Sequence, residues 1–198
     1  MSDNTVTEWA VLNDAHEALR TAVRGVAAED WDLPTPCAGW TVTQVLQHAA
    51  GDQIGFASFI TGGPGPSENP FAPSGKLDGS PLDMAEEAMK AAADAWATVG
   101  EDVQEVSVPV PPGKLPAPLG AGACALDAAV HAWDIAVATG RPSPLTPELA
   151  RELMPVATAI VEPLRAFGAY APALGAEDGD DEVAALLRYL GRRPDWTA

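Results

Sequence analysis

The sequence predicts an all-α fold, a bundle of four long helices joined by long crossover loops. Two observations indicate this: apolar residues recur at intervals of three and four along several segments, and residues that favour helix ends flank those segments. The length of 198 residues suits one domain that can bury a core without a disulfide or a metal. We therefore expect a single domain over residues 1–198, in which residues 168–198 form a short C-terminal helical extension.

The first two helices are predicted over residues 7–26 and 41–60, where apolar residues gather on one face of each helix. The segment between them contains Pro34 and Pro36, which favour an extended connection. Thr41 is a residue type that caps helix starts, so the second helix should begin there.

A long connection follows over residues 61–79. It is rich in glycine and proline and can bury little. We expect an exposed loop, for which a lid over a site is one role. It lacks the Lys-Ser/Thr ending of a phosphate-binding loop. Ser80 and Pro81 then start a third helix that runs to about Val99.

Further elements are predicted in the second half of the chain. Alternating apolar and polar residues over 103–110 indicate a short strand or extended arm. A fourth helix is expected over residues 122–139 and ends at Gly140, a natural left-handed cap. A fifth helix opens at Thr146, and a short last helix covers residues 183–190.

The charge of the chain restricts its partners. Lys and Arg total 11 against 28 Asp and Glu, a net charge of −17. This balance argues strongly against a nucleic-acid groove and also against docking on anionic membranes. The sequence has no run of about 18 apolar residues and opens with polar, acidic residues rather than a signal peptide. We expect a cytoplasmic protein whose two cysteines, Cys37 and Cys124, are reduced thiols.

The residues best suited to chemistry lie on the fourth helix. Asp127 and His131 are four residues apart, so their side chains share one face and can bind the same metal ion. A third ligand must come from elsewhere, and His48 on the second helix is the candidate. Three protein ligands leave a coordination position open for water or substrate. The alternative is a surface ion pair of Asp127 and His131 beside a solvated or hydrogen-bonded His48.

Other polar residues have open roles. Cys124 and Asp134 continue the same stripe at spacings of three. Cys124 is either a fourth ligand or a buried thiol, and Asp134 either orients a histidine ring or is a surface carboxylate. Cys37 is either a reactive thiol before a helix N-terminus or a small buried loop residue. His16 is expected on a helix surface without a role. The tryptophans Trp31, Trp40 and Trp133 are expected to be packing anchors.

Three motifs resemble a known family. The segment WDLPTPCAGW at residues 31–40, followed by His48, looks like the opening motif of actinobacterial DinB-like proteins, which belong with the mycothiol-dependent maleylpyruvate isomerase N-terminal domains. The stretch DAAVHAWDIAVATG at residues 127–140 resembles their second motif. The ending LLRYLGRRPDW at residues 186–196 resembles the C-terminus of one metal-binding subfamily. The three motifs occur in the expected order and span most of the chain.

The resemblance implies a DinB-like four-helix bundle that holds one divalent metal. Its ligands would be a histidine of the second helix and an acid-x-x-x-His pair of the fourth, here His48, Asp127 and His131. Relatives are commonly described with Glu where this chain has Asp127, a difference that bears on metal identity and affinity. Zinc is the expected ion, with nickel and iron(II) as alternatives. The family also implies mycothiol as a co-substrate that adds to, or is transferred onto, a small electrophile.

The leading hypothesis is a metal- and thiol-dependent transferase or isomerase, whose partners are a small-molecule thiol and an electrophilic substrate. The first alternative is a metal-dependent hydrolase, with water at the open position and a carboxylate as base. The second is a non-enzymatic bundle that binds metal or forms a homodimer. The sequence has no Gly-x-Ser-x-Gly elbow and no His-Glu-x-x-His, so it gives no support to a serine hydrolase or a common metalloprotease.

Overall fold

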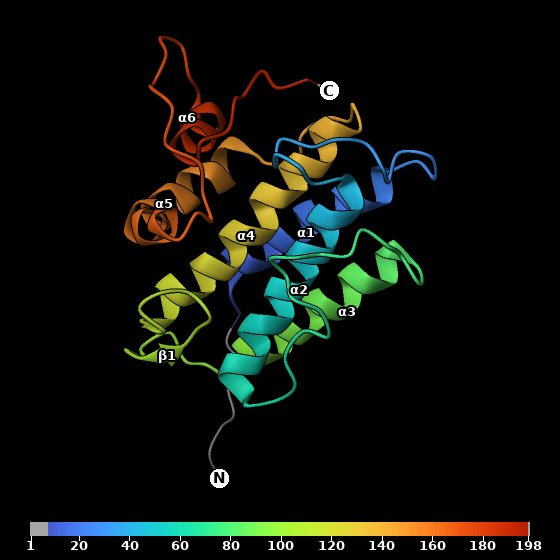
Figure 1. Ribbon diagram of the computed structural model, residues 1–198. Helices are drawn as coiled ribbons and strands as arrows, with labels where there is room; N and C mark the ends of the chain where they lie inside the picture. The colour runs from blue at the N-terminus through green and yellow to red at the C-terminus, as the bar shows by residue number, and fades with distance from the viewer. Residues whose placement is uncertain (1–7, 198) are drawn as a thin grey trace.

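The computed structural model describes residues 8–197 and is predominantly helical (Figure 1), which confirms the predicted all-α class. The helices of this range are α1 (Ala10–Gly25), α2 (Val42–Thr61), α3 (Pro81–Trp96), α4 (Ala117–Ala138), α5 (Pro147–Ala166) and α6 (Glu182–Tyr189). A small antiparallel hairpin joins β1 (Val106–Ser107) to β2 (Lys114–Leu115).

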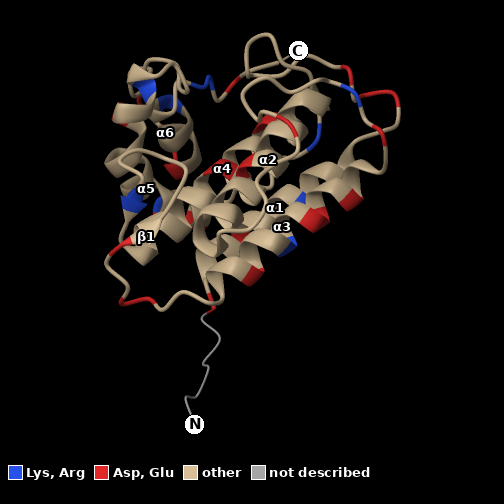
Figure 2. Cartoon of the chain, turned by 60° about the horizontal axis from the view of Figure 1, so that its bottom comes forward, with Lys and Arg blue, Asp and Glu red and all other residues tan. Residues whose placement is uncertain are grey.

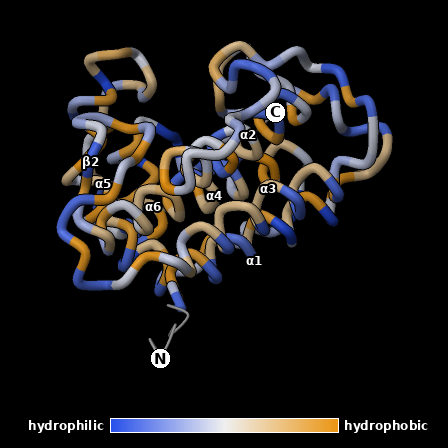
Figure 3. Tube along the Cα trace, turned by 90° about the horizontal axis from the view of Figure 1, so that it is seen from below, coloured by the Kyte–Doolittle hydropathy of each residue, from blue (hydrophilic) through white to orange (hydrophobic). Residues whose placement is uncertain are grey.

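The first four helices form the bundle. Helix α1 packs against α3 and α4, and α2 packs against the same two helices from its own side. Helix α5 lies against the outer side of α4 and carries α6, so the C-terminal elements lie outside the bundle (Figure 1). Apolar residues line the inner sides of the helices, as Figure 3 shows. Acidic residues are spread over the surface, whereas α5 and α6 carry a group of basic residues (Figure 2).

Helix α4 is the central helix, and its predicted start at residue 122 is wrong because it begins at Ala117. Gly120 and Gly122 lie inside the helix, where they let neighbours approach closely. A Cβ on Gly120 would lie 2.7 Å from Cη2 of Trp96, and one on Gly122 would lie 2.6 Å from Cγ2 of Val156. Of the helices in residues 8–197, α4 alone is long and apolar enough to cross a membrane, but 94% of its apolar window is buried inside the fold.

The helix ends follow the predicted signals. Thr41 and Gln44 form a reciprocal capping box at the start of α2. Ser80 caps α3 through its side chain, and Gly140 adopts the left-handed conformation, with φ of 65°, after α4. The predicted strand over 103–110 shrinks to two residues. Pro109, Pro111 and Pro112 follow after Val108, and prolines lack the N–H group that a longer ladder needs.

The long loop, residues 62–79, is mostly exposed as predicted, yet side chains of α2 hold it in place. Nε2 of Gln44 donates to the Pro73 carbonyl at 3.2 Å, and Nε2 of Gln47 donates to the Lys76 carbonyl at 2.8 Å. The loop therefore follows the outer side of the helix that carries His48.

Candidate metal centre

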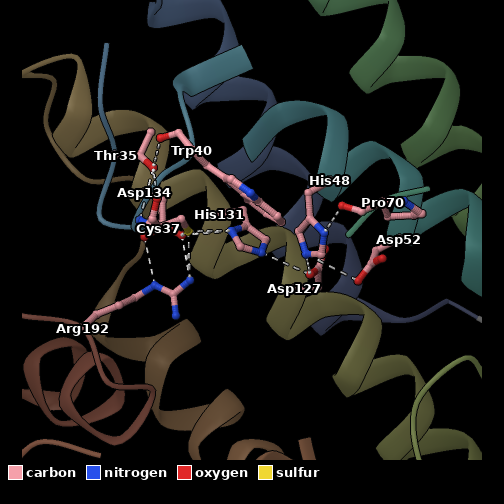
Figure 4. Close-up of polar contacts among 10 residues, drawn as sticks. All are labelled: Thr35, Cys37, Trp40, His48, Asp52, Pro70, Asp127, His131, Asp134 and Arg192. Atoms are coloured by element: carbon pink, nitrogen blue, oxygen red, sulfur yellow. Dashed lines mark hydrogen bonds and ion pairs between the residues drawn. The ribbon is translucent and has the colours of Figure 1, made fainter. Parts of the chain in front are cut away.

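The fold brings His48, Asp127 and His131 together where α2 faces α4 (Figure 4). One carboxylate oxygen of Asp127, Oδ1, lies 3.5 Å from Nε2 of His48 and 3.4 Å from Nε2 of His131. One ligand atom from each residue lies within 4.8 Å of the others, close enough to share an ion. All three residues are buried, so the alternative of a surface ion pair is wrong.

Both imidazole rings are oriented by a partner on the far side of the ring. Nδ1 of His48 donates to the Pro70 carbonyl at 2.9 Å. Nδ1 of His131 lies 2.9 Å from Oδ2 of Asp134. Because each Nδ1 is engaged in this way, each Nε2 is directed at Asp127. Histidines that bind metals have this arrangement, in which an outer partner fixes the tautomer and the ring.

The second oxygen of Asp127 lacks a partner. Its Oδ2 is buried and accepts no hydrogen bond from any residue of the described range 8–197. A buried polar atom without a partner is costly, and a cation beside it would remove the penalty. Two imidazole nitrogens and a carboxylate are ligands that Zn²⁺ accepts in sites with an open position. The residues present therefore fit a divalent ion.

The electrostatics of the cluster are dominated by opposite charges at short range. Burial would raise the pKa of Asp127, but the charge of His131 holds it well below its usual range. Burial would lower the pKa values of His48 and His131, yet Asp127 raises both, that of His131 strongly. Protons and a metal ion would thus compete for the same nitrogen atoms.

Two further ionisable groups near the cluster were not found from the sequence. Oδ2 of Asp52 lies 3.7 Å from Nε2 of His48, one helical turn further along α2. Burial and the charge of Asp127 raise the pKa of Asp52 to about 7. The same two causes raise the pKa of Tyr170, in the connection after α5, to about 12. The spacing of four between His48 and Asp52 was the available signal, whereas nothing local marks Tyr170.

Aromatic rings flank His48 on two sides. The ring centroids of Trp40 and Phe71 lie 5.0 Å and 5.5 Å from that of His48. Phe71 belongs to the long loop and is 64% exposed. The loop approaches α2 this closely because of Gly51, where a Cβ would lie 2.8 Å from Cγ of Pro70. The predicted packing anchor Trp40 and the long loop therefore both lie beside the cluster.

A second group of side chains contacts Asp134 beside His131 (Figure 4). Its carboxylate is fully buried and pairs with Arg192 through two hydrogen bonds of 2.9 Å and 2.8 Å. Sγ of Cys37 also donates to it at 3.2 Å. Cys37, His131 and Asp134 are close enough to hold a metal themselves. However, both oxygens of Asp134 already accept hydrogen bonds, and a guanidinium occupies that side.

This geometry answers the question that the sequence left open for Asp134 and shows where Cys37 lies. Asp134 contacts the ring of His131 and is not a surface carboxylate, because its side chain is 0% exposed. Cys37 is half-buried and reaches the same carboxylate. Arg192 was not singled out from the sequence, although it lies in the third family-like motif.

His16 and Cys124 belong to a different polar group, inside the bundle. The expectation that His16 lies on a surface is wrong, since it is 5% exposed and its Nε2 lies 2.8 Å from Oε1 of Gln53. Cys124 donates to the same oxygen at 3.1 Å, so it is a buried thiol that lies apart from the cluster of His48, Asp127 and His131. The face of α1 that carries His16 packs against other helices, and polar residues are tolerated there because they satisfy one another.

The fold and this cluster define a DinB-like helical bundle with a His–Asp–His group between its second and fourth helices. The model of the mycothiol maleylpyruvate isomerase N-terminal domain matches residues 12–136, and the chain belongs to this family.

Relatives cover most of the chain. Two uncharacterized proteins of Mycobacterium tuberculosis, from strains CDC 1551 / Oshkosh and ATCC 25618 / H37Rv, are each 30% identical over 181 residues. The match covers 87% of this chain and 92% of each relative. No solved structure matches the chain significantly. The family match includes the three cluster residues and Asp134 but ends before α5 and α6.

Proposed function

We propose that this protein binds one divalent metal ion through His48, Asp127 and His131. The observation that carries the proposal is the convergence of two Nε2 atoms on one oxygen of Asp127, while the other oxygen is buried without a hydrogen bond from residues 8–197. Zinc suits these ligands best, and nickel or iron(II) also accept imidazole.

The proposed activity is transfer of a low-molecular-weight thiol, mycothiol in this family, onto a small electrophile in the cytoplasm, or isomerisation through such an adduct. Membership of the mycothiol maleylpyruvate isomerase N-terminal domain family supports the choice of thiol. When bound, the ion supplies a positive charge that favours thiolate over thiol at neutral pH.

The residues of the chain have distinct tasks in this proposal. The Pro70 carbonyl and Asp134 keep a proton on Nδ1 of His48 and of His131, so that both Nε2 atoms face the cluster. Trp40 and the exposed ring of Phe71 give the rim an apolar surface that contacts the electrophile and limits access of water.

Elemental analysis tests the metal proposal. Wild-type protein should carry one divalent ion per chain, and His48→Ala or His131→Ala should lose most of it while the bundle stays folded, because its core is sufficient without the ion. The matched control is His16→Gln, which alters a buried histidine outside the cluster and should keep the metal. Stoichiometric metal in both ligand variants would contradict the assignment.

Turnover assays distinguish the activities. Metal-loaded protein is mixed with a panel of small electrophiles, with and without thiol. Product formation that needs both metal and thiol supports the transferase or isomerase. Turnover that persists without thiol indicates a metal-dependent hydrolase instead. Bound metal without any turnover favours a non-enzymatic role, and light scattering then tests whether the bundle is a homodimer.

A further inference from the structure

We propose that Arg192 is a positioning residue for the metal centre: its guanidinium fixes Asp134, and Asp134 in turn fixes the ring of His131. The inference rests on the proposed metal site and adds a residue from beyond the family match of residues 12–136. Under this proposal the region after α6, which contains Arg192, supports the metal-binding site.

The contact between Arg192 and Asp134 fixes the plane of the carboxylate. Nε of Arg192 donates to Oδ1 at 2.9 Å and Nη2 donates to Oδ2 at 2.8 Å. Two parallel bonds from a planar fork restrict rotation of the carboxylate as one bond cannot. The side chain of Arg192 is 11% exposed and that of Asp134 is 0% exposed, so little water can reach the pair to replace either bond.

The fixed carboxylate determines how His131 presents its nitrogens. Oδ2 of Asp134 lies 2.9 Å from Nδ1 of His131, and an ionised carboxylate can only accept. The hydrogen is therefore held on Nδ1, and Nε2 is directed at Oδ1 of Asp127, 3.4 Å away. Rotation of Asp134 would remove this constraint and let the ring turn.

The two histidines differ in what supports them. His48 donates to a main-chain carbonyl, that of Pro70, whose position is set by the backbone of the loop. His131 depends on a side chain, which needs a support of its own. Gly191 makes that support possible, since its left-handed φ of 78° turns the chain after α6 and its lack of a Cβ leaves room for the Ala171 carbonyl, 2.8 Å from where a Cβ would be.

The same segment supplies a matched control. Arg188 in α6 is as buried as Arg192, with 14% of its side chain exposed, and pairs with Glu177 at 2.6 Å and Asp180 at 3.0 Å. It holds the connection between α5 and α6 and touches none of the cluster residues. Removing Arg188 therefore shows how much the loss of a buried, ion-paired arginine in this region affects the protein when the metal cluster is not contacted.

Zinc affinity, measured by competition with a chromophoric chelator, tests the inference. Arg192→Met should weaken binding by about 10- to 100-fold, the usual effect of removing an outer partner of a ligand. Arg192→Lys keeps the positive charge but not the planar pair of donors, so it should lose less zinc affinity than Arg192→Met. It also serves as a second test variant in case Arg192→Met does not fold. Arg188→Met should bind zinc like the wild type.

Proton NMR of metal-free protein gives a readout that is independent of metal. The Nδ1–H of His131 should give a downfield resonance protected from exchange, whether or not Nε2 is protonated. Arg192→Met should speed its exchange and leave the Nδ1–H of His48 unchanged. Wild-type affinity and protection in both Arg192 variants, or equal losses in Arg188→Met, would overturn the inference. If the wild type binds no metal, the metal proposal fails and this resonance alone decides the role of Arg192.

Discussion

At the scale of single residues, the site is built from charges that burial would ordinarily disfavour. Asp127, His131, Asp134 and Arg192 are buried or nearly so, and each is stabilised by an opposite charge. Removing one partner of such a pair costs about 3–5 kcal/mol, because the other charge is left buried alone. Spacing on one helix singles out Asp127 and His131 as candidate ligands, and His48 is added by its place on the second helix and by the resemblance. Arg192 could not be found in this way, since its partner lies 58 residues away.

His16 provides a residue-scale prediction for the pH dependence of stability. Burial lowers the pKa of His16 from 6.5 in the folded protein. Below that pH the unfolded chain binds a proton that the folded chain does not, so acid destabilises the fold. His16→Gln removes this effect and can keep a hydrogen bond to Gln53. As pH falls below about 6.5, the wild type should lose up to about 1.4 kcal/mol per pH unit relative to the variant.

Urea unfolding at about pH 7.5 and about pH 5.5 measures the difference in each protein. The comparison with the variant cancels the contributions of the other titratable groups, including His48 and His131. A free-energy difference that stays the same at both pH values would contradict the buried, neutral state of His16.

At the scale of elements, the contact between α2 and the long loop determines how the ring of His48 is oriented. The helix supplies His48, and the loop supplies the carbonyl of Pro70 that orients it. Composition predicted an exposed loop, and Ser80 predicted where it ends. The contact itself depends on the absence of a side chain at Gly51. A glycine is needed there because Pro70, nineteen positions later in the chain, packs against that position. The sequence of α2 alone therefore cannot explain why a glycine lies inside this helix.

Gly51→Ala and Gly55→Ala give an element-scale prediction with opposite outcomes on one helix. A Cβ on Gly55 would have its nearest neighbour, Cγ of Pro109, 4.0 Å away, so Gly55→Ala should stabilise the protein by up to about 1 kcal/mol through helix propensity. Gly51→Ala gains the same propensity but collides with Pro70. It should release the loop, speed exchange at Nδ1–H of His48 and weaken zinc binding.

Hydrogen exchange followed by mass spectrometry, together with zinc titration, checks both variants. Faster exchange in residues 66–74 should occur in Gly51→Ala alone. Equal behaviour of the two variants would mean that the loop does not depend on its contact with α2.

At the scale of the whole molecule, α4 is the common support of the bundle and of the C-terminal elements. It carries two of the proposed ligands on one side and packs against α5 on another. The helical periodicity predicts the bundle, but it also places the start of α4 at Gly122, five residues after the true start at Ala117. Gly122 instead lets α4 approach Val156 of α5 closely, and this tertiary contact cannot be read from the local sequence pattern.

Gly122→Ala gives the prediction for the whole molecule. The new Cβ would lie 2.6 Å from Cγ2 of Val156, so α4 and α5 must separate at a cost of about 1–3 kcal/mol. The double variant with Val156→Ala makes room for the methyl group and should recover part of the loss. Thermal unfolding of the two single variants and the double variant measures the coupling. Strictly additive losses would contradict a direct collision.

The distribution of the site along the chain has a consequence for how the protein is made. Cys37 and Arg192, which meet beside Asp134, are 155 positions apart. A chain emerges from the ribosome with its N-terminal part first, so His48 is exposed well before Asp127 and His131, and Arg192 follows last. Under the proposed assignment, an ion captured by the nascent chain is held at first by ligands that are not yet oriented, and the site reaches its full affinity only after α6 has docked.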